Sequence, residues 1–224
     1  MEESSVAGEP TGTGVSLVAR SGGDRVRRGI DIVVALLGLL CSGPCMLAIA
    51  LLIRIDSRGP ALFWQTRLGR GATPFKFVKF RTLCIDARLR FPELYAYQYT
   101  DAELEQLPFK QPDDPRVTHV GRWLRRSSLD ELPNLWNVLR GDMTLVGPRP
   151  EIPEMLQYYH GDMLEVFRVR PGVTGAAQVY GRARLNIAAS IRIDVDYLRQ
   201  RTLKSDLRII ARTVLVVLRR EGAV

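Results

Sequence analysis

One uninterrupted apolar run constrains the fold of this chain more than any other feature. Residues 32–53 carry no charged side chain and are mostly Leu, Ile, Val and Ala. As a single α-helix, at ~1.5 Å per residue, the run would be about 33 Å long, close to the ~30 Å hydrocarbon core of a bilayer. A helix of a soluble core usually keeps a polar face, and this run has none. We therefore predict a membrane-embedded helix, and a buried core helix is the weaker alternative.

The centre of the run predicts that this helix does not continue straight. Pro44 lacks an amide hydrogen and its ring crowds the carbonyl one turn earlier, so a kink or a break is expected at Ser42-Gly43-Pro44. Arginines flank the run on both sides, which leaves the positive-inside rule without a preferred orientation for a spanning helix. We favour a re-entrant hairpin, residues 25–58, with both ends on the cytoplasmic side and the freed backbone groups satisfied by Ser42 or by packing. A plain spanning helix and a cleaved signal peptide are the alternatives.

Composition narrows the remaining classes. The chain has 224 residues, of which 46% are hydrophobic and 25% are charged, so collagen, a fully disordered chain and a disulfide scaffold are excluded. Two histidines and three cysteines do not provide the closely spaced ligands of a zinc site, so any metal is expected to bind oxygen. The net charge of +8 favours an anionic partner, which at this point is a phospholipid surface, a phosphate-bearing substrate or nucleic acid.

The rest of the chain divides into a polar arm and a globular domain. Residues 1–24 are small and polar without apolar periodicity, which is typical of a disordered arm. Residues 59–224 are expected to form a mostly helical α/β catalytic domain that begins with short strands, 61–68 and 75–80, around a Gly/Pro loop. Helices are predicted over residues 83–107, 129–139, 151–167, 190–201 and 203–220.

The last predicted helix is amphipathic. It has an apolar stripe on one side and regularly spaced basic residues, Lys204, Arg208 and Arg212, on another. Such a helix can lie in the interface of an anionic membrane. Packing on the core as an ordinary surface helix is an equal alternative.

Adjacent carboxylates at Asp130 and Glu131 are the first candidate catalytic pair. Ser128-x-x-Glu131 has the pattern of a capping box, and acidic residues are favoured in the first turn of a helix, so a structural role is one interpretation. Pro133, however, interrupts the helix that such a cap would begin, and two arginines lie just upstream. A carboxylate held near arginines stays ionised and can act as a nucleophile toward phosphorus or as a ligand of Mg²⁺.

Other charged residues extend this candidate site. Lys79 and Arg81 follow a predicted strand, and Arg149 lies between two prolines; each suits a phosphate group but could equally be a solvated charge. Asp194-x-Asp196 resembles the acidic metal motif of nucleotide-sugar glycosyltransferases, but residues two apart on a helix face different ways. Neither a Walker A motif nor Gly-x-Gly-x-x-Gly occurs, which argues against a kinase or a dehydrogenase.

Several longer motifs follow the apolar run in a fixed order. They are Asp56-x-x-Gly59-Pro60, Gln65-x-Arg67-x-Gly69, Lys79-Phe80-Arg81-Thr82, Ser128-Leu129-Asp130-Glu131-Leu132-Pro133, Trp136-Asn137-Val138-Leu139-x-Gly141-Asp142-Met143, Val146-Gly147-Pro148-Arg149-Pro150 and Arg170-Pro171-Gly172-Val173-Thr174-Gly175. This order, over roughly residues 25–220, resembles the bacterial sugar transferases, the monotopic phosphoglycosyl transferases that begin the assembly of surface polysaccharides and glycans. The short polar arm resembles the minimal catalytic form of that family.

The resemblance implies a reaction and a location. A sugar-1-phosphate would pass from a UDP-sugar to polyprenyl (undecaprenyl) phosphate, with release of UMP, through a phosphosugar bound covalently to an aspartate. The product, polyprenyl-diphosphate-sugar, would begin bacterial glycan or exopolysaccharide assembly. The implied fold is a small α/β domain on the cytoplasmic face of the inner membrane, anchored by a re-entrant helix and interfacial helices. Phospholipid is an implied partner, nucleic acid is not, and homodimer formation stays open.

The resemblance also implies roles for individual residues. Asp130 would be the nucleophile, and Asp130 and Glu131 would hold Mg²⁺. Arg125 would join them as a catalytic residue. The implied substrate-binding residues are Lys79, Arg81, Arg149, Gln178, Arg182 and Asp194.

The chain departs from the family pattern in two places. Gly43 separates Ser42 from Pro44, where the family commonly joins serine and proline, which puts the expected backbone bond of the serine in question. Ala176 and Tyr180 stand where Trp and Asn are expected in the glycine-rich loop. These departures concern the helix turn and the loop and leave the class of reaction unchanged.

Two rival functions are kept for comparison. A membrane-associated glycosyltransferase would use Asp194-x-Asp196, release UDP and form no covalent intermediate. A basic membrane scaffold or nucleic-acid-binding protein is favoured only by the net charge and leaves Asp130-Glu131 unexplained.

Overall fold

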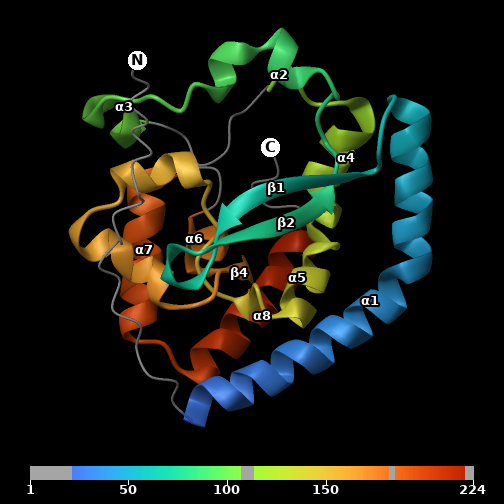
Figure 1. Ribbon diagram of the computed structural model, residues 1–224. Helices are drawn as coiled ribbons and strands as arrows, with labels where there is room; N and C mark the ends of the chain where they lie inside the picture. Colours follow the sequence, from blue (N-terminus) through green and yellow to red (C-terminus); the bar gives the residue numbers. More distant parts are fainter. Residues whose placement is uncertain (1–21, 107–113, 182–184, 220–224) are drawn as a thin grey trace, which may run out of the picture.

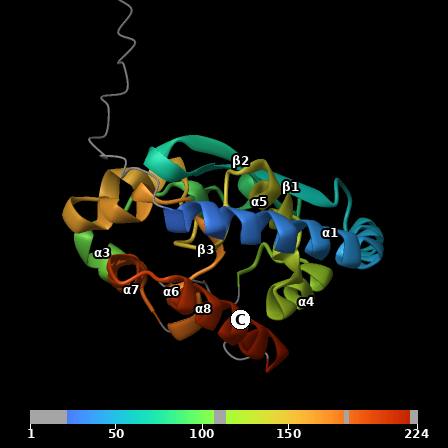
Figure 2. The same ribbon diagram turned by 90° about the horizontal axis from the view of Figure 1, so that it is seen from below.

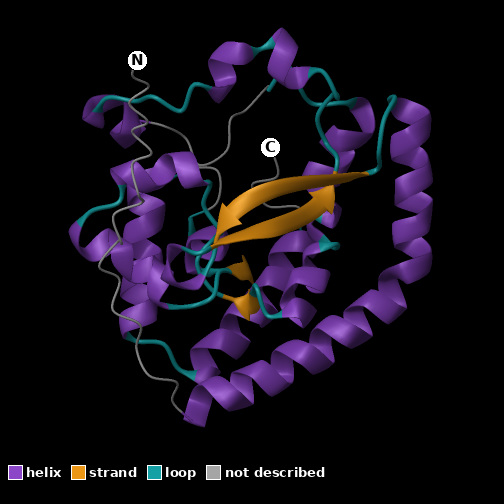
Figure 3. Cartoon of the chain, viewed as in Figure 1, coloured by secondary structure: helices purple, strands orange, loops and turns teal. Residues whose placement is uncertain are grey.

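The computed structural model describes residues 22–106, 114–181 and 185–219. The fold is mostly helical with two short two-stranded sheets, which confirms the predicted α/β class at that level (Figure 1 and Figure 3). The helices are α1 Gly22–Asp56, α2 Ala87–Arg90, α3 Asp101–Gln106, α4 His119–Ser127, α5 Asn134–Arg140, α6 Ala176–Tyr180, α7 Ile187–Arg199 and α8 Leu203–Leu218. The strands are β1 Leu62–Leu68, β2 Pro74–Phe80, β3 Thr144–Val146 and β4 Gly172–Thr174. The 3₁₀ turns are η1 Arg70–Ala72, η2 Pro92–Tyr95, η3 Leu129–Glu131, η4 Pro153–Tyr158 and η5 Gly161–Arg168.

The apolar run lies within α1, which passes through Pro44 without a break. The helix bends instead: in Figure 2 its first half crosses the view, whereas its second half is seen nearly end-on. The Ser42 hydroxyl donates to the Gly38 carbonyl at 2.6 Å, a bond that favours local bending of a helix. Pro44 cannot donate to the carbonyl of Leu40, so the serine bonds a different carbonyl from the one that the proline frees. The helix is therefore kinked as expected, but a hairpin with a broken turn is not seen.

The first half of α1 is fastened to the domain by polar side chains. Arg28 donates to two carbonyls at the C-terminal end of α5, at 2.6 and 2.8 Å. Asp31 is buried and accepts hydrogen bonds from the Thr144 hydroxyl at 2.8 Å and from the Leu145 amide at 2.9 Å. These bonds hold the start of α1 against α5 and β3.

The far end of α1 is fastened to the same domain. Asp56 accepts a hydrogen bond from the Val120 amide, in the first turn of α4, at 3.1 Å. Just beyond the helix, Arg81 donates to the Ser57 hydroxyl at 2.8 Å and to the Pro60 carbonyl at 2.7 Å. Both ends of the apolar helix are thus bound by one globular unit.

Between these ends, α1 has two apolar faces with different surroundings. Ala35, Ile49 and Ile53 are almost fully buried against the domain. The opposite face is exposed and includes Val33, Leu36, Leu37, Leu40, Leu47, Leu51 and Ile55. Among the described residues, α1 is the one helix long and apolar enough to cross a membrane by length and composition.

The β1–β2 hairpin forms as predicted, with an antiparallel register that pairs Trp64 with Val78. The connecting turn places Gly71 at a φ of 70°, a conformation that glycine adopts without strain. Asn137 from α5 is fully buried and holds β2 from the side, accepting from the Val78 amide at 3.1 Å and donating to the Lys76 carbonyl at 2.7 Å.

The small parallel sheet brings two glycine-containing loops together. β3 pairs with β4, and a Cβ added to Gly172 would lie 2.2 Å from the backbone nitrogen of Gly147. Contact this close excludes any side chain at that position. The packing sets the Pro148-Arg149-Pro150 turn beside the start of α6.

Several predicted helices are wrong in extent or type. The expected helix over 83–107 consists of short turns, because Pro92 begins a new turn where the helix would continue. The segment 151–167 forms η4 and η5, separated at Gly161, whose φ is 54°. The helix expected over 129–139 begins only at Asn134. The helices predicted over 190–201 and 203–220 are confirmed as α7 and α8. The predicted polar arm lies outside the described residues except for 22–24, which belong to α1.

Replacing Asn137 tests whether its side chain holds β2. Asn137→Ala should lower the free energy of unfolding by about 2–4 kcal/mol, because a buried amide and a buried carbonyl would lose their partners. Lys76→Ala removes an exposed side chain from the same strand and should cost less than about 0.5 kcal/mol. Thermal unfolding of both variants in detergent gives the comparison, and equal losses would contradict the assigned role.

Candidate active site

A cavity of about 810 Å³ lies between the hairpin, η3, the Pro148-Arg149-Pro150 turn and helices α6, α7 and α8. Its polar wall contains most of the residues that the sequence singled out. These are Lys79, Arg125, Asp130, Glu131, Arg149, Gln178 and Asp194.

The turn that carries the two carboxylates is not a helix cap. Ser128 ends α4 in the left-handed region, with a φ of 58°, and its side chain makes no capping bond. Asp130 and Glu131 then lie in the single 3₁₀ turn η3, and α5 starts only after Pro133. The capping-box interpretation is therefore wrong. The sharp reversal at Ser128 instead directs the buried Asp130 into the cavity.

Lys79 is the cation nearest to Asp130 among the described ion pairs. Its ammonium nitrogen lies 3.9 Å from an Asp130 carboxylate oxygen. Burial lowers the pKa of Lys79 to about 8, against the opposing attraction of Asp130 and in the same direction as the nearby arginines. Because this lysine is the penultimate residue of β2, the hydrogen bonds of Asn137 to that strand also set its position.

Arg149 holds the second carboxylate. Its guanidinium donates to a Glu131 oxygen at 2.9 Å. Burial lowers the pKa of Arg149, but the carboxylates around it, Glu131 first, outweigh burial and raise that pKa overall. The prolines on either side restrict the backbone of this arginine, so its charge has a fixed place in the cavity wall.

Arg125 is oriented by a buried aspartate that the sequence analysis missed. Asp114 receives a two-pronged pair from Arg116, at 2.8 and 2.9 Å, and lies 3.5 Å from Arg125. Arg125 also donates to the Thr82 hydroxyl at 3.3 Å. Burial lowers the pKa of Arg125, while Asp114 opposes that change. The sequence signal that could have indicated Asp114 is Asp114-Pro115-Arg116, in which two opposite charges are separated by a conformationally restricted proline.

Arg67 also lines the cavity, although the sequence predicted no role for it beyond its place in the Gln65-x-Arg67-x-Gly69 motif. It donates to the Gln65 side chain at 3.0 Å and to the Pro150 carbonyl at 3.0 Å, and it lies 3.8 Å from Glu151. Burial lowers its pKa, against the attraction of Glu151. Arg67 therefore connects the hairpin to the turn that carries Arg149.

Asp194 contributes a carboxylate from α7. It is buried and accepts a hydrogen bond from the Ala177 amide, in the first turn of α6, at 3.0 Å. Burial raises the pKa of Asp194 to about 7, against the lowering effect of backbone amides. Asp196 is exposed on the same helix and does not line the cavity, so the two carboxylates do not form a joint metal site.

Gln178 on α6 also lines the cavity. Its side-chain nitrogen donates to the Val173 carbonyl at 3.4 Å, whereas its side-chain oxygen is buried and has no hydrogen-bond partner among the described residues. A buried acceptor without a partner is costly, so this oxygen is suited to a donor group of a ligand.

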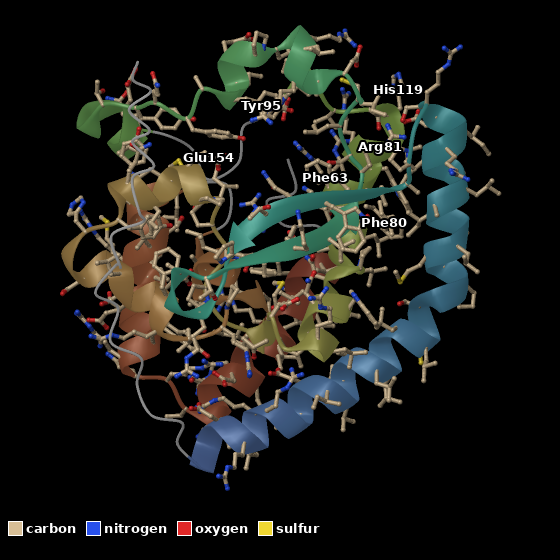
Figure 4. The ribbon with its side chains drawn as sticks, in the orientation of Figure 1. Phe63, Phe80, Arg81, Tyr95, His119 and Glu154 are labelled. Atoms are coloured by element: carbon tan, nitrogen blue, oxygen red, sulfur yellow. The ribbon has the colours of Figure 1, made fainter. Side chains whose placement is uncertain are left out.

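The remaining predicted residues lie elsewhere. Arg81 is not part of the cavity wall, because its guanidinium is used by Ser57 and Pro60; Figure 4 shows it beside the loop that follows α1, near His119. Ser42 and Pro44 are in α1, away from the cavity wall. Arg182 lies outside the described residues.

One arm of the cavity is apolar. Val34 of α1 and Leu135 of α5 form one side, and Ile210, Val214 and Val217 of α8 form another. The cavity therefore joins a charged centre to an aliphatic wall that includes part of the apolar helix.

The donor set permits a magnesium ion only with help from a ligand. Among the described residues, no three His, Cys, Asp or Glu side chains cluster as a metal site would require. Mg²⁺, however, commonly binds one or two protein carboxylates together with substrate phosphates and water. Asp130 meets that requirement, whereas an oxygen of Glu131 is already paired with Arg149.

The raised pKa of Asp194 predicts a pH-dependent stability. Between about pH 4 and pH 7 the folded chain keeps a proton that the unfolded chain has released, so this group's contribution to stability falls as the pH rises through that window. Asp194→Asn keeps an oxygen acceptor without charge and should be more stable than the unchanged protein above pH 7, by up to about 4 kcal/mol. Thermal unfolding at pH 5 and pH 8 measures the effect, with the exposed Asp196→Asn as control. Parallel pH profiles for all three proteins would refute it.

Comparison with known proteins finds relatives over nearly the whole described part of the chain. The profile of the family described as bacterial sugar transferase matches residues 23–220. An undecaprenyl-phosphate galactose phosphotransferase of Salmonella typhimurium is 39% identical over 199 residues, which are 88% of this chain and 41% of that protein. A UDP-glucose:undecaprenyl-phosphate glucose-1-phosphate transferase of Caulobacter vibrioides is 41% identical over 212 residues, 89% of this chain and 72% of that protein.

A shorter relative is matched over nearly its full length. The exopolysaccharide production protein ExoY of Rhizobium meliloti is 34% identical over 201 residues, 90% of this chain and 89% of that protein. The chain spans only about two fifths of several longer relatives, such as the Salmonella protein, of which 41% is covered. Because the family profile and these relatives cover nearly the same residues as the cavity-bearing domain, this chain belongs to the bacterial sugar transferase family.

Proposed function

We propose that this protein transfers a sugar-1-phosphate from a UDP-sugar to undecaprenyl phosphate and releases UMP. The observation that carries the proposal is the buried carboxylate of Asp130 beside Lys79, in a cavity lined by four arginines and an apolar arm. The names of two relatives, for galactose and for glucose transfer, supply the class of substrates. The product would begin the assembly of a bacterial glycan or exopolysaccharide.

The chemistry has two steps at one phosphorus atom. An Asp130 oxygen attacks the phosphorus that bears the sugar, the bond from this phosphorus to the bridging oxygen breaks, and UMP leaves. An oxygen of undecaprenyl phosphate then attacks the same phosphorus, the bond to Asp130 breaks, and undecaprenyl-diphosphate-sugar is formed. A carboxylate is already ionised and needs no base to activate it, which suits a cavity that is rich in cations.

The cations of the cavity support the proposed binding of a diphosphate. Lys79 lies beside the nucleophile, and Arg125 and Arg149 enter from α4 and from the proline-flanked turn. Each arginine is oriented by its own carboxylate, Asp114 or Glu131. Fixed charges of this kind stabilise the negative charge that develops when UMP leaves, without reorganisation at that moment.

Magnesium is proposed as the cofactor. Asp130 would contribute a ligand oxygen, with Glu131 close by and the donor phosphates completing the coordination. The ion would neutralise charge on the diphosphate. The residues of the chain would still position the donor and keep the nucleophile in place.

The anchorage of α1 supports a re-entrant membrane helix. A spanning helix carries its ends to opposite sides of a bilayer, yet Arg28 and Asp56, near the two ends of α1, bind the same domain. We propose that the domain lies on the cytoplasmic face of the inner membrane, with the exposed apolar face of α1 in lipid. The apolar arm between α1 and α8 would then receive the isoprenoid chain of the acceptor from the membrane. The exposed Leu207, Val214 and Leu215 of α8 support an interfacial position for that helix.

Asp130→Asn tests the nucleophile. The variant should lose turnover by at least about 10³-fold and should no longer become labelled from UDP-sugar carrying ³²P in the sugar-bearing phosphate, because an amide cannot form the phosphosugar bond. The protein, held in detergent with Mg²⁺ and undecaprenyl phosphate, is assayed with UDP-glucose and UDP-galactose. Asp196→Asn, on the exposed side of α7, is the matched control and should keep its activity.

The nucleotide product separates this proposal from its rivals. Release of UMP supports phosphosugar transfer, whereas release of UDP would favour a glycosyltransferase. Full activity of Asp130→Asn would eliminate the covalent mechanism.

Membrane topology is a separate prediction. In a variant with Cys41, Cys45 and Cys84 replaced by serine, single cysteines placed before Arg25 and after Arg58 should both be labelled from the cytoplasmic side only. An impermeant maleimide applied to spheroplasts and to inverted vesicles gives the result. Labelling from opposite sides would establish a spanning helix instead.

A further inference from the structure

Another part of the cavity wall carries two tyrosines, and the reaction proposed above assigns it no role. It is formed by the segment 91–99, which contributes Glu93, Leu94, Tyr97 and Tyr99 to the lining. Figure 4 shows Tyr95, on the same segment, pointing toward the body of the protein.

Tyr97 has an unusual backbone in this wall. Its φ is 49°, in the left-handed region that a bulky side chain seldom adopts because the conformation is strained. The hydroxyl of Tyr158, from η4, holds the segment in this form: it donates to the Tyr97 carbonyl at 3.2 Å and accepts from the Tyr99 amide at 2.8 Å. The fold therefore determines the position of Tyr97, against the intrinsic backbone preference of a tyrosine.

The surroundings of Tyr97 connect it to the phosphate-binding cations. Tyr95 packs edge-on against it, with ring centroids 6.3 Å apart, and the Arg116 guanidinium lies over the Tyr95 ring at 4.9 Å. Burial raises the pKa of Tyr97, and Arg67 and Arg116 oppose that rise. Tyr97 therefore lines the same cavity as these two arginines, with Arg116 stacked on the ring that it contacts.

The apolar arm and the wall formed by segment 91–99 suit different ligand groups. An isoprenoid chain is flexible and aliphatic, and it matches the Leu, Ile and Val side chains between α1 and α8. A nucleobase is planar, and stacking on an aromatic side chain strengthens the binding of any base. The aromatic residues among the described lining residues are Tyr97, Tyr99 and Tyr159. Tyr159 donates its hydroxyl to Glu151 at 3.3 Å and packs against the Phe167 ring at 5.0 Å, so segment 91–99 is the better candidate for stacking on a ligand.

We propose that Tyr97 stacks on the base of the nucleoside diphosphate part of the donor, so that segment 91–99 forms the nucleoside subsite. This inference rests on the proposed use of a UDP-sugar. Lys79, Arg125 and Arg149 hold the diphosphate as proposed above, and the base covers the Tyr97 ring.

The test compares two ligands that differ only by the base, UDP and ribose 5-diphosphate. Their affinities are measured by isothermal titration calorimetry on the full chain in detergent with Mg²⁺. The unchanged protein should bind UDP at least about tenfold more tightly than ribose 5-diphosphate, and Tyr97→Leu should reduce this ratio to less than about threefold by weakening UDP alone. Tyr97→Phe keeps the ring and should keep the ratio.

The ratio within each variant distinguishes stacking from general damage to the fold. A Tyr97→Leu protein that retains the full ratio, or one that loses affinity for both ligands equally, overturns the inference, as does an unchanged protein without any preference for UDP. If the unchanged protein transfers sugar-phosphate but Tyr97→Leu retains the ratio, only the subsite is wrong. If the ratio behaves as expected but no sugar-phosphate is transferred from any UDP-sugar, the subsite stands and the proposed function fails.

Discussion

Both ends of α1 are bound by hydrogen bonds to the domain that carries the cavity, and the rest of the structure depends on this constraint. Arg28 and Asp31 fasten the first half of the helix to α5 and β3, and Asp56 fastens its end to α4. A long apolar helix held in this way must bend and expose its outer face along the surface of the domain. The same bonds hold in place α5, which carries Asn137, and α4, which carries Arg125.

The cavity resolves a physical conflict between burial and charge. Burying cations without partners is costly, so the cations of the wall are paired with carboxylates. The pairs are Lys79 with Asp130, Arg149 with Glu131, Arg67 with Glu151, and both Arg116 and Arg125 with Asp114. The pairs come from different elements, so their geometry depends on the packing of the whole domain. A diphosphate that enters this wall meets charges that are already desolvated and oriented, which is the arrangement that favours phosphoryl transfer.

Sequence reasoning succeeded where a local rule decides the structure. Apolar periodicity predicted α8, the alternation of short aromatic stretches around a Gly/Pro turn predicted the β1–β2 hairpin, and the motif order identified the family. Seven of the predicted polar residues meet in one cavity because the motifs lie at the ends of elements that pack together. The predictions of long helices over 83–107 and 151–167 were wrong because prolines and a left-handed glycine divide these segments into short turns.

The errors at the site have a different physical origin. Arg81 looks like a phosphate ligand in sequence, but its guanidinium completes the backbone hydrogen bonding after α1, a contact between positions 24 residues apart that no local pattern reveals. Asp114 was overlooked because its role, to orient Arg116 and Arg125, exists only after the chain has folded. Ser128 was interpreted as a cap because the pattern gives no indication of its left-handed backbone.

The partners of α1 also impose an order on biosynthesis. Arg27 pairs with Asp206, 179 residues later, and Asp31 bonds Thr144, 113 residues later. At the ~5–20 residues per second of translation, α1 leaves the ribosome roughly ten seconds or more before its last partner exists. During that interval the partners of Asp56, Arg28 and Asp31 are made one after another, and the partner of Arg27 is made last. The attachment of the first half of the helix is therefore completed late, by the part of the chain that forms α8.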